Sequence, residues 1–148
     1  MSFLRALDIS ASGMTAQRMR LDIAAENVVN INTTRTENGG PYRRKMAVFE
    51  PIGGTSFDQV FRSTVARQRQ SAVGGVRVAE IVEDERPFQM VYDPSHPDAD
   101  ENGYVQMPNV DLLKETVDSM AATRAYDANL TVFNTVKNMA TKALEIGR

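Results

Sequence analysis

The sequence predicts a mainly α-helical protein with a small β-rich insert, in which long N- and C-terminal helices pack as an antiparallel coiled coil. Two observations predict this fold class. All six prolines and seven of the nine glycines lie within residues 39–108, which excludes long helices from the middle of the chain. Both ends carry apolar residues at alternating spacings of three and four, the pattern by which helices pack together. We therefore expect residues 1–31 and 109–148 to form a helical inner domain, with 32–108 as a β-rich outer domain.

The N-terminal helix is expected to begin near Ser2, a suitable N-cap, and to end near Asn30, where polar residues and glycine take over. Its apolar stripe follows a heptad pattern that Arg18 interrupts. The stripe consists of Leu4, Leu7, Ala11, Met14, Leu21, Ala25 and Val28. Gly13 weakens a helix by about 1 kcal/mol relative to alanine. Its presence therefore suggests close packing at this point.

The middle of the chain is expected to form short strands and turns. Apolar and β-branched residues between turn signals predict strands at residues 45–49, 76–82 and 88–92. A short amphipathic helix fits residues 57–65.

The C-terminal helix is expected to follow Pro108, with Asn109 as its N-cap and with Asp111 and Glu115 near the positive end of the helix dipole. Its late apolar residues alternate at spacings of four and three: Val132, Val136, Met139, Ala143 and Ile146. An earlier stripe drifts around the helix, which suggests contact with more than one neighbour. That stripe consists of Leu113, Val117, Met120 and Ala121. We expect the apolar stripes of both helices to form an assembly interface.

Composition excludes several classes of function. The formal net charge of −2 lacks the basic excess of a nucleic-acid-binding protein. The absence of cysteine excludes disulfides, thiolate metal sites and cysteine nucleophiles. Arg5 and Asp8 interrupt the apolar run that a secretory signal peptide needs, and no apolar run is long enough to span a membrane.

Charge is divided within the middle of the chain. Residues 32–77 carry a net charge of +5, and residues 78–108 carry −7. The two parts are either two solvated faces or complementary patches that meet between copies of the protein.

Three candidate chemical sites have simpler interpretations. His96, the one histidine, lies in a turn-rich stretch with no nucleophile motif, so we expect a loop histidine and no catalysis. Residues 98–103 match the opening of a calcium-binding EF-hand loop, but Asn109 replaces the glutamate expected at its twelfth position. The short basic run 43–45 is expected to be a solvated strand start. We therefore expect no enzyme activity, cofactor or metal.

Several stretches together resemble a known family. Residues 7–18 (LDISASGMTAQR) and 25–33 (AENVVNINT) are similar to the N-terminal signature of bacterial flagellar axial proteins. The stretches GGPYRRK, VYDPSHPDAD, GYVQMPNV and KALEIGR narrow the resemblance to the proximal-rod members of that family, over the whole chain.

The resemblance implies a structural subunit of the rod, which spans the periplasm in the basal body, transmits torque and encloses the export channel. It implies export through the flagellar type III apparatus without a cleaved signal peptide. The implied partners are copies of the chain, other proximal-rod and distal-rod proteins, the MS-ring protein and the rod-base adaptor protein, with no nucleic acid and no direct membrane insertion. Another axial subunit, or a cytosolic coiled-coil adaptor, remains an alternative.

Overall fold

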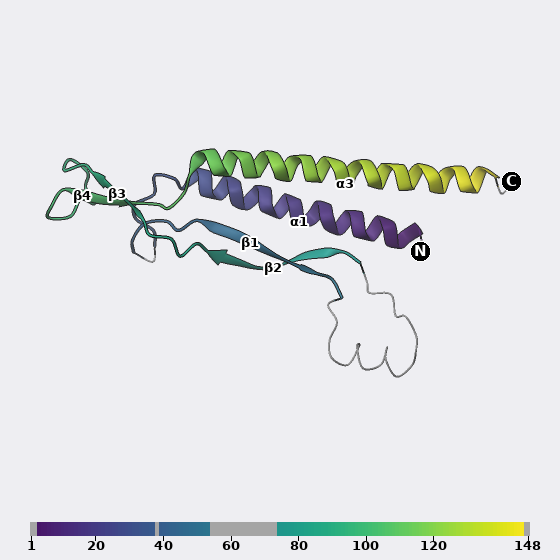
Figure 1. Ribbon diagram of the computed structural model, residues 1–148, viewed down its shortest axis with the longest axis horizontal. Coiled ribbons are helices and arrows are strands. Elements are labelled where there is room, and N and C mark those ends of the chain that lie inside the picture. The colour runs from purple at the N-terminus through teal and green to yellow at the C-terminus, as the bar shows by residue number, and fades with distance from the viewer. Residues whose placement is uncertain (1–2, 38, 54–73, 147–148) are drawn as a thin grey trace, which may run out of the picture.

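Two long helices lie side by side along the molecule in the computed structural model, which describes residues 3–37, 39–53 and 74–146 (Figure 1). Helix α1 spans Phe3–Val29 and helix α3 spans Leu112–Ile146. The helices run in opposite directions, so the N- and C-terminal ends lie at the same end of the molecule (Figure 1). The predicted arrangement of two long terminal helices around a β-containing insert is confirmed.

The insert contains two separate antiparallel sheets of two strands each. Strand β1 (Lys45–Pro51) pairs with β2 (Val76–Glu83), and β3 (Gln89–Tyr92) pairs with β4 (Tyr104–Met107). Three of these strands match the predicted ones. The fourth, β4, was not predicted, because four residues between a glycine turn and Pro108 carry too short a pattern to indicate a strand.

Helix α1 is the middle layer of the molecule. Helix α3 packs along one side of α1, and the β1–β2 hairpin packs along another (Figure 1). The hairpin is fastened to α1 where the backbone N–H of Val76 donates a 3.1 Å hydrogen bond to Ser12 Oγ. The β3–β4 sheet lies at the end of the molecule opposite the chain termini (Figure 1). The β1–β2 hairpin of the insert thus packs along α1. The division of the chain into an inner and an outer domain stays a prediction.

The boundaries of the two helices have local causes. Helix α1 ends as expected near Asn30, whose side-chain amide donates to the carbonyl of Glu26 at 2.9 Å. Helix α3 begins at Leu112, and Asp111 Oδ1 accepts hydrogen bonds from the N–H groups of Leu113 (3.0 Å) and Lys114 (3.4 Å). The N-cap is therefore Asp111, and the expectation of Asn109 was wrong because the Asn109 side chain bonds to other parts of the chain.

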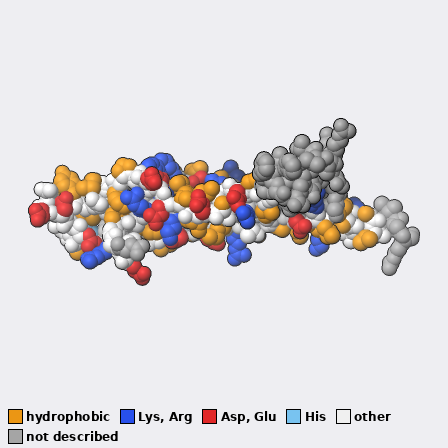
Figure 2. Space-filling view, turned by 90° about the horizontal axis from the view of Figure 1, so that it is seen from below, with side chains coloured by type: hydrophobic (Ala, Val, Ile, Leu, Met, Phe, Trp, Pro, Cys, Tyr) orange, Lys and Arg blue, Asp and Glu red, His pale blue; other side chains and the backbone are white. Residues whose placement is uncertain are grey.

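The packed core is narrow and unusually polar for its size. Its buried apolar residues are Ala16, Ile23, Ala24, Tyr42, Val105, Val110 and Ala122. Its buried polar residues are Ser10, Asn27, Asp84, Asn109 and Glu115. On the face in Figure 2, hydrophobic side chains are mixed with charged ones along the whole length. Much apolar surface is therefore left outside the core.

Among the residues described, no helix combines the length and the hydropathy that crossing a bilayer requires. The Ser2 cap and the short helix predicted at residues 57–65 lie outside the described residues.

Candidate functional site

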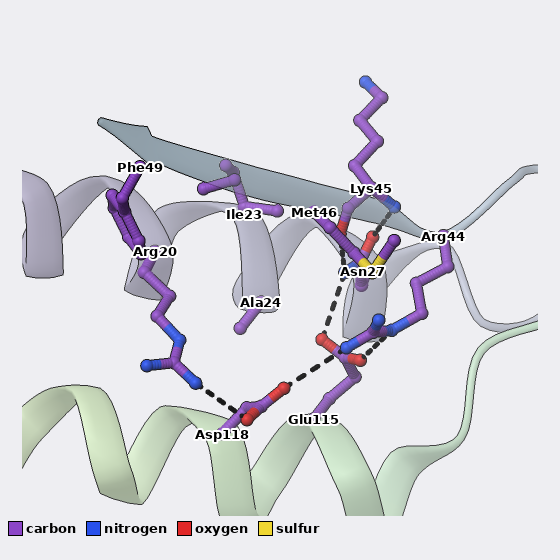
Figure 3. A pocket seen from close by; sticks show the side chains of 11 residues that line it. Arg20, Ile23, Ala24, Asn27, Arg44, Lys45, Met46, Phe49, Glu115 and Asp118 are labelled. Atoms are coloured by element: carbon purple, nitrogen blue, oxygen red, sulfur yellow. Dashed lines mark hydrogen bonds and ion pairs between the residues drawn. The ribbon is translucent and has the colours of Figure 1, made fainter. Parts of the chain in front are cut away.

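A buried polar junction joins α1, α3 and the start of β1 (Figure 3). Its centre is Asn27, whose Oδ1 accepts hydrogen bonds from the hydroxyl of Tyr42 and from the backbone N–H of Lys45, both at 2.9 Å. Its Nδ2 donates to the carbonyl of Lys45 (2.9 Å) and to Glu115 Oε2 (3.0 Å). Asn27 thus pairs with Lys45 through both backbone groups, as a neighbouring strand would, and covers the edge of β1.

A chain of ion pairs continues the junction across the two helices. Glu115 is only 1% exposed, and Arg44 donates from Nε to its Oε1 at 2.6 Å. Arg44 also reaches Asp118 at 3.2 Å, and Asp118 in turn accepts from Arg20 of α1 at 2.9 Å (Figure 3). A buried carboxylate is tolerated only when it is paired and hydrogen-bonded. Arg44 and Asn27 meet that requirement for Glu115.

Asn109 fastens the second side of the junction. Its Oδ1 accepts from the N–H of Arg44 at 2.8 Å, and its Nδ2 donates to the carbonyls of Asp84 (2.9 Å) and Arg86 (3.1 Å). The start of β1, the end of β2 and the segment before α3 are therefore held by one side chain. A buried amide with every bond made fixes a single arrangement of these segments.

Two titratable groups at the junction have displaced pKa values. The hydrogen bond from the Arg86 side chain, 2.8 Å from its Nε to Oδ2, is the main reason that the pKa of Asp84 lies below its usual value. Burial, and then the charges of Glu26, Glu115 and Glu83, raise the pKa of Tyr42 to about 12. The Tyr42 hydroxyl is therefore held neutral, the state in which it can donate to Asn27.

Sequence reasoning did not predict this junction. Arg44 was expected at a solvated strand start, Asn109 as a helix cap and Glu115 as a charge near a helix end. Each assignment used only neighbours in sequence, whereas the three side chains meet across segments that are far apart in the chain. One available signal was that Asn27, Arg44 and Asn109 all lie in the stretches that carry the family resemblance.

None of the predicted N-terminal interface residues is fully buried within the chain. Leu7, Ala11, Met14, Leu21 and Val28 are half-buried, whereas Leu4 and Ala25 are exposed. The residues of α1 that the structure buries are Ser10, Gly13, Ala16, Ile23, Ala24 and Asn27. Four of them directly precede a predicted residue, so the packed face lies about 100° around the helix from the apolar stripe.

The C-terminal stripe shows the same displacement. Leu113, Val117, Met120, Val132, Met139 and Ala143 are exposed, and Val136 is half-buried. The residues of α3 that the structure buries are Glu115 and Ala122, and Phe133 is half-buried. Nothing is described of the Ile146 side chain. Six of the predicted C-terminal interface residues are thus exposed within the chain, and their role as an assembly interface stays a prediction.

Small side chains bring the two helices close together. A Cβ atom added to Gly13 would lie 3.0 Å from both amide atoms of the Asn129 side chain. The retention of glycine at this position, which the sequence analysis linked to close packing, therefore has a steric cause. Ala122 of α3 is fully buried, as is Ala16 of α1.

The divided charges of the insert are used partly inside the chain. Arg44 pairs with Glu115, Lys45 with Glu26, and Arg77 with Glu50. These charged side chains are therefore already paired within the chain. They contribute less to the complementary patches between copies that the sequence analysis considered.

The remaining candidate sites are turns. His96 Nδ1 accepts from the N–H of Asp98 at 3.1 Å, and Asp100 Oδ1 accepts from the N–H groups of Asn102 (2.9 Å) and Tyr104 (2.8 Å). Over the described ranges, no three carboxylate or imidazole side chains lie close enough to hold a metal ion. An open hollow of about 360 Å³ lies beside the junction, lined by Ile23, Phe49 and the ion pairs (Figure 3).

Comparison with known proteins identifies relatives along the whole chain. A family model described as "Flagella basal body rod protein" matches residues 7–35, and one described as "Flagellar basal body rod FlgEFG protein C-terminal" matches residues 101–146. The chain is 47% identical to the flagellar basal-body rod protein FlgC of Bacillus subtilis, with 100% of both chains covered. It is 41% identical to the FlgC proteins of Borreliella burgdorferi (99% and 98% covered) and Salmonella typhimurium (100% of both). The two matched segments contain Asn27 and Glu115, which bond to each other at the junction.

Proposed function

Because the chain belongs to the FlgC family of flagellar basal-body rod proteins, we propose that the outward apolar stripes of α1 and α3 are the surfaces through which it assembles. The protein is a structural subunit of the flagellar proximal rod and acts in the basal body. Its family is structural, and we propose that the chain works mechanically, with no substrate and no cofactor.

One observation carries the proposal. The most deeply buried residues of α1 and α3 are small or polar, apart from Ile23, whereas several large apolar residues of α3 face outward. Leu113 is 73% exposed, Val117 57% and Met139 58%. Apolar surface in contiguous stripes is costly in water, at about 25 cal/mol per Å². Copies and neighbouring subunits that cover these stripes would recover that free energy on assembly.

The assembly unit is the antiparallel pair of α1 and α3, packed as a coiled coil within the inner domain formed by residues 1–31 and 109–148. The insert, residues 32–108, forms the outer domain of the subunit. Its neighbours are copies of the chain, other proximal-rod and distal-rod proteins, the MS-ring protein and the rod-base adaptor. The subunit arrives through the type III export apparatus. The family relationship supports these assignments.

The junction supports a mechanical role as well. Torque that enters through one element of the subunit must leave through another, so the elements must not slide past one another. Asn27, Arg44 and Asn109 bond α1, α3 and both strands of the β1–β2 hairpin into one unit. Buried and fully bonded side chains resist such sliding, because any shift leaves a buried polar group without a partner.

The substitution Met139→Asp tests the assembly surface. Because Met139 is 58% exposed in the free subunit, we expect the stability of the purified protein to change by no more than about 0.5 kcal/mol. A carboxylate buried against a neighbour is strongly unfavourable. We therefore expect export to continue, isolated basal bodies to lack the variant, and swimming in soft agar to be lost.

Two variants serve as controls. Asn138→Asp places the same charge one residue away, on the polar side of α3, and should swim normally. Val136→Asp should destabilise the purified protein itself, since Val136 is half-buried beside α1. Normal swimming and normal basal bodies with Met139→Asp would show that this stripe is not an assembly surface.

A further inference from the structure

The outer edge of strand β3 has no partner within the described part of the chain. The backbone N–H of Asp93 donates to the carbonyl of Gly103 at 2.9 Å, so these two residues are a hydrogen-bonded pair of the β3–β4 ladder. Bonded and non-bonded pairs alternate along an antiparallel ladder, so the backbone groups of Met90 and Tyr92 point away from β4. Outside that ladder, no described residue bonds to the backbone of either one.

Two other strand edges of the insert are covered by the chain itself. Asn27 bonds to both backbone groups of Lys45 at the edge of β1. At the outer edge of β4, the N–H of Tyr104 donates to Asp100 Oδ1 at 2.8 Å, and its carbonyl accepts from the N–H of Asp100 at 2.9 Å. Strand β3, with the sequence Gln-Met-Val-Tyr, has neither such a cover nor the charged residues that commonly protect an edge.

Strand β3 also exposes its side chains. Met90 is 55% exposed and Tyr92 is 65% exposed. The ring of Tyr92 packs edge to face on the ring of Tyr104, which is also exposed, with 5.3 Å between the ring centroids. A ribbon of two strands is marginally stable by itself. An open backbone edge between exposed apolar side chains is the arrangement to which an additional strand binds.

The charge around this ribbon indicates the chemistry of that strand. Residues 78–108 contain eight acidic groups and one basic group, and Asp84 is the one acid among the eight that forms an ion pair within the described ranges. Four of the other acids, Asp93, Asp98, Asp100 and Glu101, lie in the turn between β3 and β4. Figure 2 shows acidic and hydrophobic side chains together at this end of the molecule. The surface therefore suits a basic partner.

The described part of the chain offers no basic surface of its own to match. Helix α1 has three basic and three acidic residues, and α3 has four of each. At the start of the insert, Arg44, Lys45 and Arg77 are paired within the chain. Arg35 lines a hollow beside Asp98 at the acidic end itself, which stays negative. The charges therefore favour a different protein as the partner over a second copy.

We infer that β3 receives an added strand from another basal-body protein and that this strand is basic. Its backbone pairs with the outward groups of Met90 and Tyr92. Its lysine and arginine side chains face the carboxylates of the turn and the tyrosine rings. This surface is separate from the helix stripes, and the inference rests on the proposed function only in placing the partner within the basal body.

Hydrogen exchange at single backbone amides tests the added strand. In the purified subunit, the amides of Met90 and Tyr92 should exchange faster than that of Val91, which points toward β4. In isolated basal bodies we expect the first two to slow by about tenfold or more and Val91 to change little. Unchanged exchange at Met90 and Tyr92 would overturn the inference. Protection that appears in the purified subunit at high concentration would show that a second copy binds there, and would overturn it as well.

Two variants of Met90 separate the backbone from the side chain. Met90→Pro removes an outward N–H and leaves the ladder with β4 intact, since proline is tolerated where the N–H faces solvent, whereas Met90→Ala keeps the N–H. The probe is a synthetic peptide of alternating lysine and valine, mixed with the purified subunit and followed by NMR. We expect it to bind the unmodified chain and Met90→Ala, and to bind Met90→Pro about tenfold more weakly or not at all. A peptide of alternating glutamate and valine should not bind.

Charge removal tests the chemistry of the partner. Asp98→Asn combined with Glu101→Gln should weaken binding of the lysine peptide about two- to fivefold, whereas Asp127→Asn, at an exposed position of α3, should not. Equal binding of the two peptides, equal binding to both Met90 variants, or no binding of the lysine peptide to the unmodified chain would each overturn the inference. None of these outcomes concerns the helix stripes, which Met139→Asp tests separately.

Discussion

At the scale of the residue, a few buried polar side chains hold together elements that a larger apolar core holds together in other proteins. Asn27 makes four hydrogen bonds, and two of them imitate the backbone pairing of a strand with Lys45. Glu115 is buried but bonded to Arg44 and Asn27. Groups of this kind stabilise little in total, yet the loss of any one partner is expensive because the others stay buried.

The substitution Asn27→Asp isolates this effect, because it changes one donor group and no volume. The new carboxylate would lose the donor to Glu115 and would lie about 3 Å from a second carboxylate, since Asn27 Nδ2 is 3.0 Å from Oε2. We expect a loss of about 3 kcal/mol in the free energy of unfolding at neutral pH, measured by urea denaturation. Asn134→Asp, at an exposed position of α3, should cost less than about 0.5 kcal/mol. Equal stability of the two variants would contradict the role given to Asn27.

Because of Tyr42, the stability of the folded protein depends on pH in the alkaline range. Burial raises its pKa from 10.0 to about 12 in the folded protein. Folding therefore favours the protonated phenol, and its contribution is complete below pH 10 and is lost as the pH rises toward 12. We expect urea midpoints to fall across this interval, and to fall less in Tyr42→Phe. Tyr92→Phe removes the hydroxyl of an exposed tyrosine and serves as the control for the substitution itself. A wild-type profile that stays level between pH 10 and 12 would argue against a buried, neutral Tyr42.

At the scale of the element, the sequence identified both helices and three of the four strands, because long periodic segments and proline positions carry strong local signals. It placed the helix–helix seam one residue away from the observed one. The stripe of large apolar residues marks the surface with the most free energy to gain from burial. In a subunit built for assembly, that surface need not face the protein's own second helix.

The junction could not be predicted from local sequence patterns, because its residues come from segments that are far apart in the chain. Asn109 next to Pro108 has the appearance of a helix cap, and nothing nearby in sequence indicates that its amide bonds to Arg44 and to the end of β2. Only the fold brings these segments together. Asp111, two residues later, was available as a cap and is the residue that caps the helix.

Gly13 sets the distance between α1 and α3, and Gly13→Leu tests this. Leucine favours helix over glycine by about 1 kcal/mol. However, its Cβ would lie 3.0 Å from the Asn129 amide, and overpacking costs about 1–3 kcal/mol before the rest of the side chain is placed. We expect a net loss of stability in thermal and urea unfolding. In a chain that also carries Asn129→Ala, part of that loss should be recovered.

Thr15→Leu provides the matched comparison, since Thr15 is exposed on the same helix and its replacement by leucine should be neutral or stabilising. If Gly13→Leu behaved like Thr15→Leu, helix propensity would dominate and the close approach of the helices would have no energetic consequence.

At the scale of the whole molecule, stability is distributed unevenly along the long axis. The ion pairs and the asparagine bonds gather at the junction, where α1 ends and α3 begins (Figure 3). Toward the chain termini the buried residues of α1 are Ser10 and Gly13, both small, and α3 finally extends beyond the described end of α1 (Figure 1). A helical segment that does not pack against another element is marginal in water. Local opening should therefore begin at the free end of α3.

Hydrogen exchange measures this gradient directly. In the purified subunit we expect amides around Ile23 and Ala122, both buried, to be the slowest, and those of residues 140–146 to exchange several hundredfold faster. Assembly should protect the same end, since neighbouring subunits would cover the exposed Leu144, so basal bodies should show slowed exchange there and little change at the junction. Uniform protection along α3 in the free subunit would mean that the helix end is stable by itself. The assembly would then gain binding surface there without ordering the chain, and the free energy of docking would not be reduced by the cost of folding the last two turns.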